Sequence, residues 1–341
     1  MIIPVCVLFS IVSCFYFKEK AYKTHIPHYI IIGIWLILII IAGLRPSEMP
    51  DIRDYRIGYL SVTNYDLGRW EPGFWLIMNF LSSINADFII LLFLMATISI
   101  GIRLYAIEKL THIFWGSMVI YLSNFFILHD MIQMRCAVAS GLMLICVYFK
   151  IKKQLFRFIL TSLIACLFHY SSILIFPIWF ISSKRSQPNL FLWLIPISYI
   201  IVSILHFHST SLFAQIPLVG PYISGYSVNF QQGEVNIFNA LQLIRCTICI
   251  LIWLNLKKMP KNDAFIILMK IYSLAICCLP LFSDIYVIAY RVSEFYLLSE
   301  IIVIPYLAYV FKPYIELGKL MVISIGVIFL FMNIFYMENL L

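Results

Sequence analysis

The sequence predicts an all-α polytopic integral membrane protein with about twelve transmembrane helices, some of them short or re-entrant. Hydrophobic residues make up 63% of the 341 positions, and charged residues make up only 12%. A soluble domain carries about twice that charged fraction. Apolar runs recur along the whole chain and no window is polar enough to form a soluble domain, so we expect a single transmembrane domain over residues 1–341.

The apolar runs give the order of the expected spans. They lie at about 2–17, 29–44, 86–107, 113–129, 132–149, 155–168, 170–182, 190–207, 239–256, 264–283, 294–311 and 319–337. The first run has neither a leading positive charge nor a small-residue cleavage site, and lysines follow it. We therefore expect it to be retained as a span with an outward N-terminus, rather than removed as a signal peptide.

Lysine-rich connections orient the expected spans. The segments "KEKAYKTH", "IEKLTH", "KIKKQLFR", "SSKRSQ", "LKKMPKND" and "FKPYIELGK" separate successive runs. By the positive-inside rule these connections face the cytoplasm. The other connections then lie outside, with two long external loops at about 45–85 and 208–238 and shorter ones near 130, near 169 and at 284–293.

The outward side differs from the inward side in the kind of basic residue it carries. The basic residues expected outside are Arg45, Arg53, Arg56, Arg69, Arg135, Arg245 and Arg291. All fourteen lysines lie on the inward side or, for Lys270, within a span. A guanidinium stays charged and offers a planar fork that fits phosphate and carboxylate. The split therefore predicts an anion-binding outward face.

Three short helices are expected to deepen that face into a cavity. The runs 155–168 and 170–182 would rise roughly 20 Å each, which is less than the roughly 30 Å of the hydrocarbon core. The tip "FHYSS" between them would then be recessed beneath the outer surface, with His169 at its apex. The orientation of the flanking loops prevents 73–84 from crossing, so we expect a re-entrant or interfacial helix there.

Three residues of the first external loop are candidates for chemistry. Glu71 precedes Pro72, so its carboxylate either complements the dipole of the following helix or accepts a proton from a sugar hydroxyl at the mouth of the cavity. Asp51 and Tyr55 are four residues apart and would share a helix face. The alternative is a solvated loop pair with neighbouring arginines.

Arginines near the ends of spans are candidate anion ligands. Arg135 is followed by small residues, so the alternative is an arginine that snorkels at a helix-packing interface. Arg245 lies about a turn inside its span and must find an acid, a lipid head group or a ligand. Arg291 is spaced to pair locally with Glu294, and Glu300 lies deeper and needs its own partner.

His169 is either a core histidine bonded to a backbone carbonyl or a group that binds sugar hydroxyls and moves a proton near neutral pH. We find no metal-ligand cluster and no phosphate-cradling glycine loop, so we expect no metal and no nucleotide cofactor. No basic block is long enough to follow a nucleic acid. The nine cysteines lie in apolar runs, which does not suit a disulfide framework.

An ordered set of short motifs resembles the EpsG-like branch of the Wzy polysaccharide polymerases. The set comprises "GLR" at 43–45, Asp51 with Tyr55, "EPGF" at 71–74, "QMRCAVA" at 133–139, "FHYSS" at 168–172 and "RVSEFYLL" at 291–298. The resemblance implies a GT-C-like glycosyltransferase architecture with its active site on the periplasmic side of the bacterial inner membrane. The donor and the acceptor would both be undecaprenyl-diphosphate-linked oligosaccharides. Transfer would invert the anomeric centre without a metal.

The resemblance also implies roles for the candidate residues. Arg45, Arg135 and Arg291, followed by Arg245, would bind the diphosphate, and Tyr55 and Glu294 would help to bind the substrate. His169 or Glu71 would be the base, and Asp51 is a further catalytic candidate. Membrane lipids are expected partners, and a chain-length regulator is a further partner that the resemblance suggests. The alternatives are an O-antigen ligase, which uses the same lipid diphosphate, and a lipid-linked oligosaccharide flippase, for which we find no internal repeat.

Overall fold

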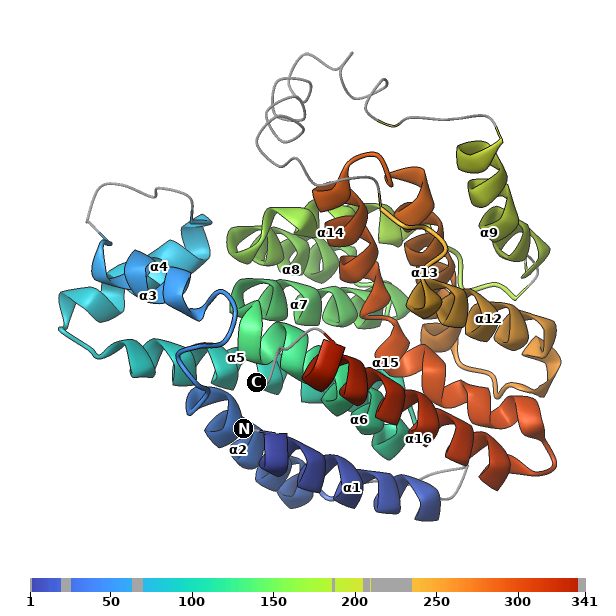
Figure 1. The fold of residues 1–341 in the computed structure, drawn as a ribbon, viewed down its shortest axis with the longest axis horizontal. Coiled ribbons are helices and arrows are strands. Elements are labelled where there is room, and N and C mark those ends of the chain that lie inside the picture. The colour runs from blue at the N-terminus through green and yellow to red at the C-terminus, as the bar shows by residue number, and fades with distance from the viewer. Residues whose placement is uncertain are drawn as a thin grey trace. The chain divides into compact units, whose positions relative to one another are not determined.

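The protein is helical throughout the part of the chain that the structure describes. The computed structural model describes residues 2–19, 26–62, 70–185, 188–204, 209 and 235–336. Every element in these ranges is a helix, and no strand occurs among them (Figure 1). This confirms the predicted all-α class.

Five helical stretches in these ranges are long and apolar enough to cross a membrane. They are α5 (Phe88–Leu110), α7 (Met134–Ile151), α13 (Asp263–Leu281), Tyr286–Phe311 and Ile315–Phe335. Shorter apolar helices are α1 (Ile2–Lys18), α2 (His28–Gly43), α8 (Leu155–Phe168), η2 (Tyr170–Phe180), α9 (Pro188–Ser203) and α12 (Ala240–Leu254). The apolar helices confirm a membrane-embedded protein. The number of crossings and a GT-C-like architecture stay predictions.

The remaining helices of the described residues refine two predicted boundaries. They are α3 (Ile52–Leu60), α4 (Pro72–Ser83), α6 (Phe114–Ile120), η1 (Tyr121–Ile132), η3 (Leu256–Lys258), α14 (Tyr286–Leu297), α15 (Glu300–Val303), η4 (Ile304–Phe311), α16 (Ile315–Phe331) and η5 (Met332–Tyr336). The helices that contain the runs predicted to start at 294 and 319 begin earlier, at Tyr286 and Ile315. Charged residues near these helix starts lower the local hydropathy without ending the helix.

Packing divides the chain into two compact units, residues 1–180 with 304–341, and residues 181–303. In the first unit, α7 packs against α5 and α8, α2 packs against α5, and α16 packs against η4. In the second unit, α13 packs against α14, α9 and α12. The single transmembrane domain over residues 1–341 stays a prediction.

A buried ion pair ties three helices of the first unit together. Arg103 of α5 donates to a carboxylate oxygen of Asp130 in η1 at 2.8 Å, and neither side chain is exposed. Arg103 also donates to the Ala137 carbonyl and to the Ser140 hydroxyl of α7, both at 3.0 Å. Tyr121 donates to the same Asp130 oxygen at 2.8 Å. The network therefore fixes the first turns of α7, where Arg135 lies.

Candidate functional site

Glu71 stands at the start of α4 in an extended backbone conformation, and Pro72 is the first helical residue. A proline suits this position because its missing N–H would have no helical partner there. The Glu71 side chain makes no capping hydrogen bond to α4. Its carboxylate is held by two other side chains, so the reading of Glu71 as only a dipole complement does not account for its contacts.

A glycine lets α4 approach the end of α8. A Cβ atom at Gly73 would lie 2.8 Å from the Leu167 carbonyl oxygen and 2.9 Å from the Leu167 Cβ atom. Only a residue without a side chain fits at these distances. His169 directly follows α8, so this close approach brings Glu71 beside His169.

The Glu71 carboxylate bridges Arg135 and His169. Arg135 Nη1 donates to Glu71 Oε2, and His169 Nδ1 lies 3.1 Å from Glu71 Oε1. The exposed fractions of the Glu71, His169 and Arg135 side chains are 4%, 17% and 23%. The carboxylate is thus enclosed, while the side chains of Arg135 and His169 are partly exposed. We call these three residues the Glu71–Arg135–His169 cluster.

The surroundings keep Glu71 ionised. Burial raises the pKa of its carboxyl group, but the hydrogen bond with His169 and the charge of Arg135 act in the opposite direction. The result is a pKa below the ordinary value for glutamate. Both oxygens of an ionised carboxylate can only accept hydrogen bonds, which suits the two partners observed.

Aromatic rings surround the guanidinium of Arg135. Its Cζ atom lies 4.9 Å from the ring centroid of Trp70, 5.7 Å from that of Tyr55 and 5.9 Å from that of Phe74. The three rings also contact one another at 5.6–5.7 Å between centroids. Burial raises the pKa of the Tyr55 hydroxyl. Arg135 is therefore fixed by cation–π contacts and an ion pair, and does not snorkel freely.

Tyr55 lies on α3 as predicted, but Asp51 lies just before the helix and does not share its face. Asp51 precedes the helix with a φ angle of 64°, and its carbonyl accepts from the Tyr55 amide at 3.0 Å. Tyr55 is buried against Arg135, whereas the Asp51 side chain is exposed. Asp51 is not among the contacts that form the cluster, and its catalytic role stays a prediction.

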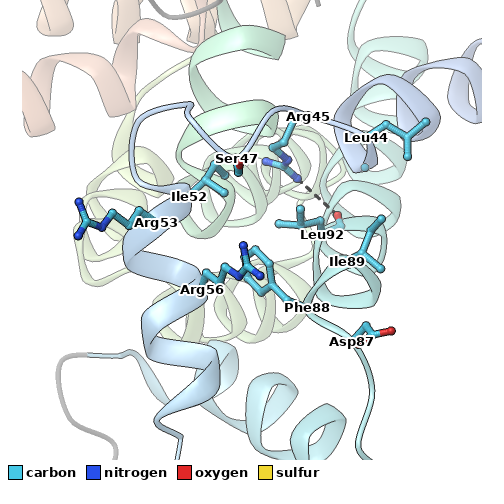
Figure 2. Close-up of a pocket in the computed structure, with 11 residues that line it drawn as sticks. Leu44, Arg45, Ser47, Ile52, Arg53, Arg56, Asp87, Phe88, Ile89 and Leu92 are labelled. Carbon is cyan, nitrogen blue, oxygen red and sulfur yellow. Dashed lines mark hydrogen bonds between the residues drawn. The ribbon is translucent and has the colours of Figure 1, made fainter.

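Arg45 is buried and bound to main-chain oxygens. Its Nη1 atom donates to the carbonyls of Asp130 and Met131 at 2.8 and 2.7 Å. Its Nη2 atom donates to the Leu92 carbonyl at 3.5 Å, a contact drawn in Figure 2. These bonds anchor the end of the "GLR" segment to η1 and α5. They give Arg45 a structural role, and its binding of a diphosphate stays a prediction.

In the second unit, Arg245 is paired with an acid, one of the three kinds of partner that the sequence left open. Its Nε atom donates to Glu300 Oε1 at 2.8 Å, and the Glu300 side chain is fully buried. Tyr272 donates to the Arg245 carbonyl at 3.3 Å. Arg291 is exposed on α14, and Glu294 on the same helix attracts Arg245 electrostatically. The anion-binding roles of Arg245 and Arg291 and the substrate-binding role of Glu294 stay predictions.

Some expectations fall outside the described residues or concern metals. Arg69 and most of the loop 208–238 lie outside the described residues. Among the residues that are described, no group of three or more histidine, cysteine or acidic side chains could hold a metal ion. All nine cysteines are free thiols.

Four residues of the site or its support were not predicted from the sequence: Arg103, Asp130, Trp70 and Phe74. A signal was present for the ion pair: Arg103 lies inside an apolar run, where a charge requires a partner, and Asp130 lies at the end of another. The two aromatic residues flank Glu71 within three positions along the chain. Aromatic residues are common throughout this sequence, so their placement around Arg135 required the structure.

The fold and the site define a polytopic helical membrane protein that holds an arginine, a carboxylate and a histidine together in one cluster. The chain belongs to the EpsG family, whose family model matches residues 28–341. This is the family of Wzy-like exopolysaccharide and O-antigen polymerases, so membership implies a polymerase-type glycosyltransferase. The resemblance seen in the motifs is confirmed. No curated protein and no solved structure matches the chain.

Proposed function

We propose that this protein is a polysaccharide polymerase of the bacterial inner membrane. It transfers a growing glycan from undecaprenyl diphosphate to a lipid-linked repeat unit on the periplasmic side. The observation that carries the proposal is the Glu71 carboxylate, whose two oxygens are occupied by Arg135 and by Nδ1 of His169. Membership in the EpsG family supports the same activity.

The geometry favours His169 over Glu71 as the base. Nε2 of His169 has no partner among the residues that the structure describes, whereas both Glu71 oxygens are engaged. An imidazole held at one nitrogen by a carboxylate can take a proton at the other, and the carboxylate then stabilises the imidazolium. We assign the proton of the acceptor hydroxyl to His169 Nε2, and the orientation of the ring to Glu71.

Arg135 is assigned to the leaving group. One of its nitrogens binds Glu71, the guanidinium also interacts with the Tyr55 hydroxyl, and the side chain is 23% exposed. The acceptor oxygen attacks the anomeric carbon from the face opposite the diphosphate. The bond from that carbon to the diphosphate oxygen breaks, and its electron pair leaves with the diphosphate. Arg135 stabilises the charge that develops there, and the anomeric centre is inverted.

The test is a gel of surface polysaccharide from a strain that lacks the gene. A deletion strain should carry glycans with a single repeat, and the wild-type gene should restore a ladder of longer chains. If the protein were a ligase, the deletion strain would contain lipid-linked polymer that is not attached to its final acceptor. Lipid extraction would detect this polymer. If the protein were a flippase, the deletion strain would carry no single-repeat glycan on its surface. Either of these outcomes would overturn the proposed polymerase.

A further inference from the structure

A cavity in the first unit lies apart from the Glu71–Arg135–His169 cluster. It has a volume of about 610 Å³ and lies between the end of α2, the first turns of α3 and the start of α5 (Figure 2). Its lining comprises Gly43, Leu44, Arg45, Ser47, Ile52, Arg53, Arg56, Asp87, Phe88, Ile89 and Leu92. The cavity is not part of the mechanism described above.

The charge in this cavity is positive. Three of its lining residues are arginines and one is an aspartate. Arg45 is committed to main-chain carbonyls, but Arg53 and Arg56 are exposed and have no hydrogen-bond or ion-pair partner among the described residues. Figure 2 shows Arg56 directed toward Phe88 and Arg53 extending outward from the same helix. Two unpaired guanidinium groups at a cavity are suited to a phosphate group.

The other part of the lining is apolar and faces outward. Leu44 and Ile89 are 57% and 44% exposed, although both belong to apolar helix ends. Phe88 and Leu92 continue this wall along α5, one of the helices long enough to cross a membrane. Exposed apolar side chains at the end of a membrane helix are in contact with lipid. A ligand that fills the cavity would therefore touch arginine at one end and hydrocarbon-facing side chains at the other.

Helix α3 separates this cavity from the cluster. Tyr55 on one face of α3 contacts the Arg135 guanidinium, while Arg53 and Arg56 on other faces line the cavity. The lysine distribution places the ends of α2 and α5 that meet here on the outward side. The cavity is thus a second, independent place for an anion at the outer membrane interface.

We infer that this cavity binds the phosphate group of a membrane lipid, with Arg56 on the phosphate, Arg53 adding positive charge at the rim, and the hydrocarbon chain against Leu44 and Ile89. The chemistry required is a phosphate ester of net negative charge on an apolar chain. An isoprenoid phosphate and an anionic phospholipid both supply it. The inference does not depend on the proposed polymerase activity, because a lipid can occupy the cavity whether or not glycans are transferred.

The experiment measures lipid binding to the purified full-length protein by native mass spectrometry. The probes are undecaprenyl phosphate, phosphatidylglycerol and the zwitterionic phosphatidylcholine. We expect the two anionic lipids to bind more tightly than phosphatidylcholine, and Arg56→Ala to weaken the binding about tenfold, as expected for one charge-assisted hydrogen bond. Arg53→Ala should weaken it as well. The tighter of the two anionic lipids identifies the source of the phosphate.

Matched variants distinguish lipid binding at this cavity from nonspecific attraction of anionic lipid to the protein. Lys152→Ala removes an exposed charge from the connection after α7 and should leave lipid binding unchanged. Ile89→Ser removes an apolar contact and should weaken binding, whereas Ile164→Ser alters an exposed residue of α8 and should not. Equal lipid binding by wild type, Arg53→Ala and Arg56→Ala would overturn the inference. Displacement of the lipid by an equal concentration of inorganic phosphate would overturn the role of the apolar chain.

Discussion

Nδ1 of His169 lies 3.1 Å from Oε1 of Glu71, although 98 positions separate the two residues in the sequence. The contact depends on the close approach of α4 to α8 at Gly73. Arg135 reaches the other oxygen of the same carboxylate from a third helix, α7. Three segments that are distant in sequence thus converge on one ionised carboxylate, and the predictions below test what each contributes.

His169→Asn tests the proposed base. An asparagine amide can keep a hydrogen bond to Glu71 but cannot accept a proton near neutral pH. We expect glycan polymerisation to fall by about 10²- to 10⁴-fold, the usual contribution of general acid–base catalysis, while the thermal midpoint changes little. The measurements are polymer length on a gel and the thermal midpoint of unfolding of the purified protein. A full-length ladder from His169→Asn would exclude His169 as the base.

Arg135→Lys tests the leaving-group contact. Lysine keeps the charge but loses the planar fork that can bind Glu71 and a phosphate oxygen together. We expect the protein to fold and polymerisation to drop by about 10²-fold, the effect of losing one stabilising donor. Arg157→Lys, an exposed arginine on α8, is the matched control and should leave chain length unchanged. Wild-type chain lengths in Arg135→Lys would remove Arg135 from the mechanism.

The depressed pKa of Glu71 predicts a pH dependence of stability. A carboxyl group with a lower pKa in the folded state stabilises the fold above its unfolded pKa, and this contribution is lost as the pH falls through the folded pKa. The difference in thermal midpoint between wild type and Glu71→Gln should therefore be largest at neutral pH and shrink below the ordinary glutamate value of 4.5. Glu316→Gln, at an exposed position, provides the control. A difference that does not vary with pH would contradict the assigned cause.

Hydropathy was sufficient to predict the helices of this fold. Every run predicted to span the membrane lies largely on a helix, because a continuous apolar run allows few other structures in lipid. Boundaries were less accurate where charged residues occupy helix ends, as at Arg291 and Glu316. The helix expected at 73–84 is α4, and Tyr55 lies on α3, although Asp51 precedes that helix and does not share its face.

The partners of the candidate residues could not be predicted in the same way. Glu71, Arg135 and His169 were each singled out, but the sequence contains no information on which acid meets which base across three helices. The partners of Arg45 could not be predicted either, because they are backbone carbonyls of another segment. Contacts of this kind depend on how helices pack, which periodicity does not encode.

Gly73→Ala tests the packing that brings Glu71 to His169. The added methyl group would lie 2.8 Å from the Leu167 carbonyl, so α4 must shift away from α8. We expect a loss of about 1–3 kcal/mol in stability, as for other overpacked sites, together with shorter polymer chains. Gly33→Ala is a matched control, because a methyl group there would meet nothing within 4 Å. Equal behaviour of the two variants in chain length and unfolding would contradict this role of Gly73.

The Arg103–Asp130 pair is expected to stabilise the frame that holds Arg135. Arg103→Leu or Asp130→Leu leaves one buried charge without its partner, which typically costs about 3–5 kcal/mol. Replacing both residues removes the unpaired charge, so the double variant should be less destabilised than the sum of the single variants. Thermal midpoints of the purified proteins, with Arg157→Leu as the exposed control, measure this coupling. Strict additivity of the two single effects would show that the 2.8 Å contact does not couple α5 to η1.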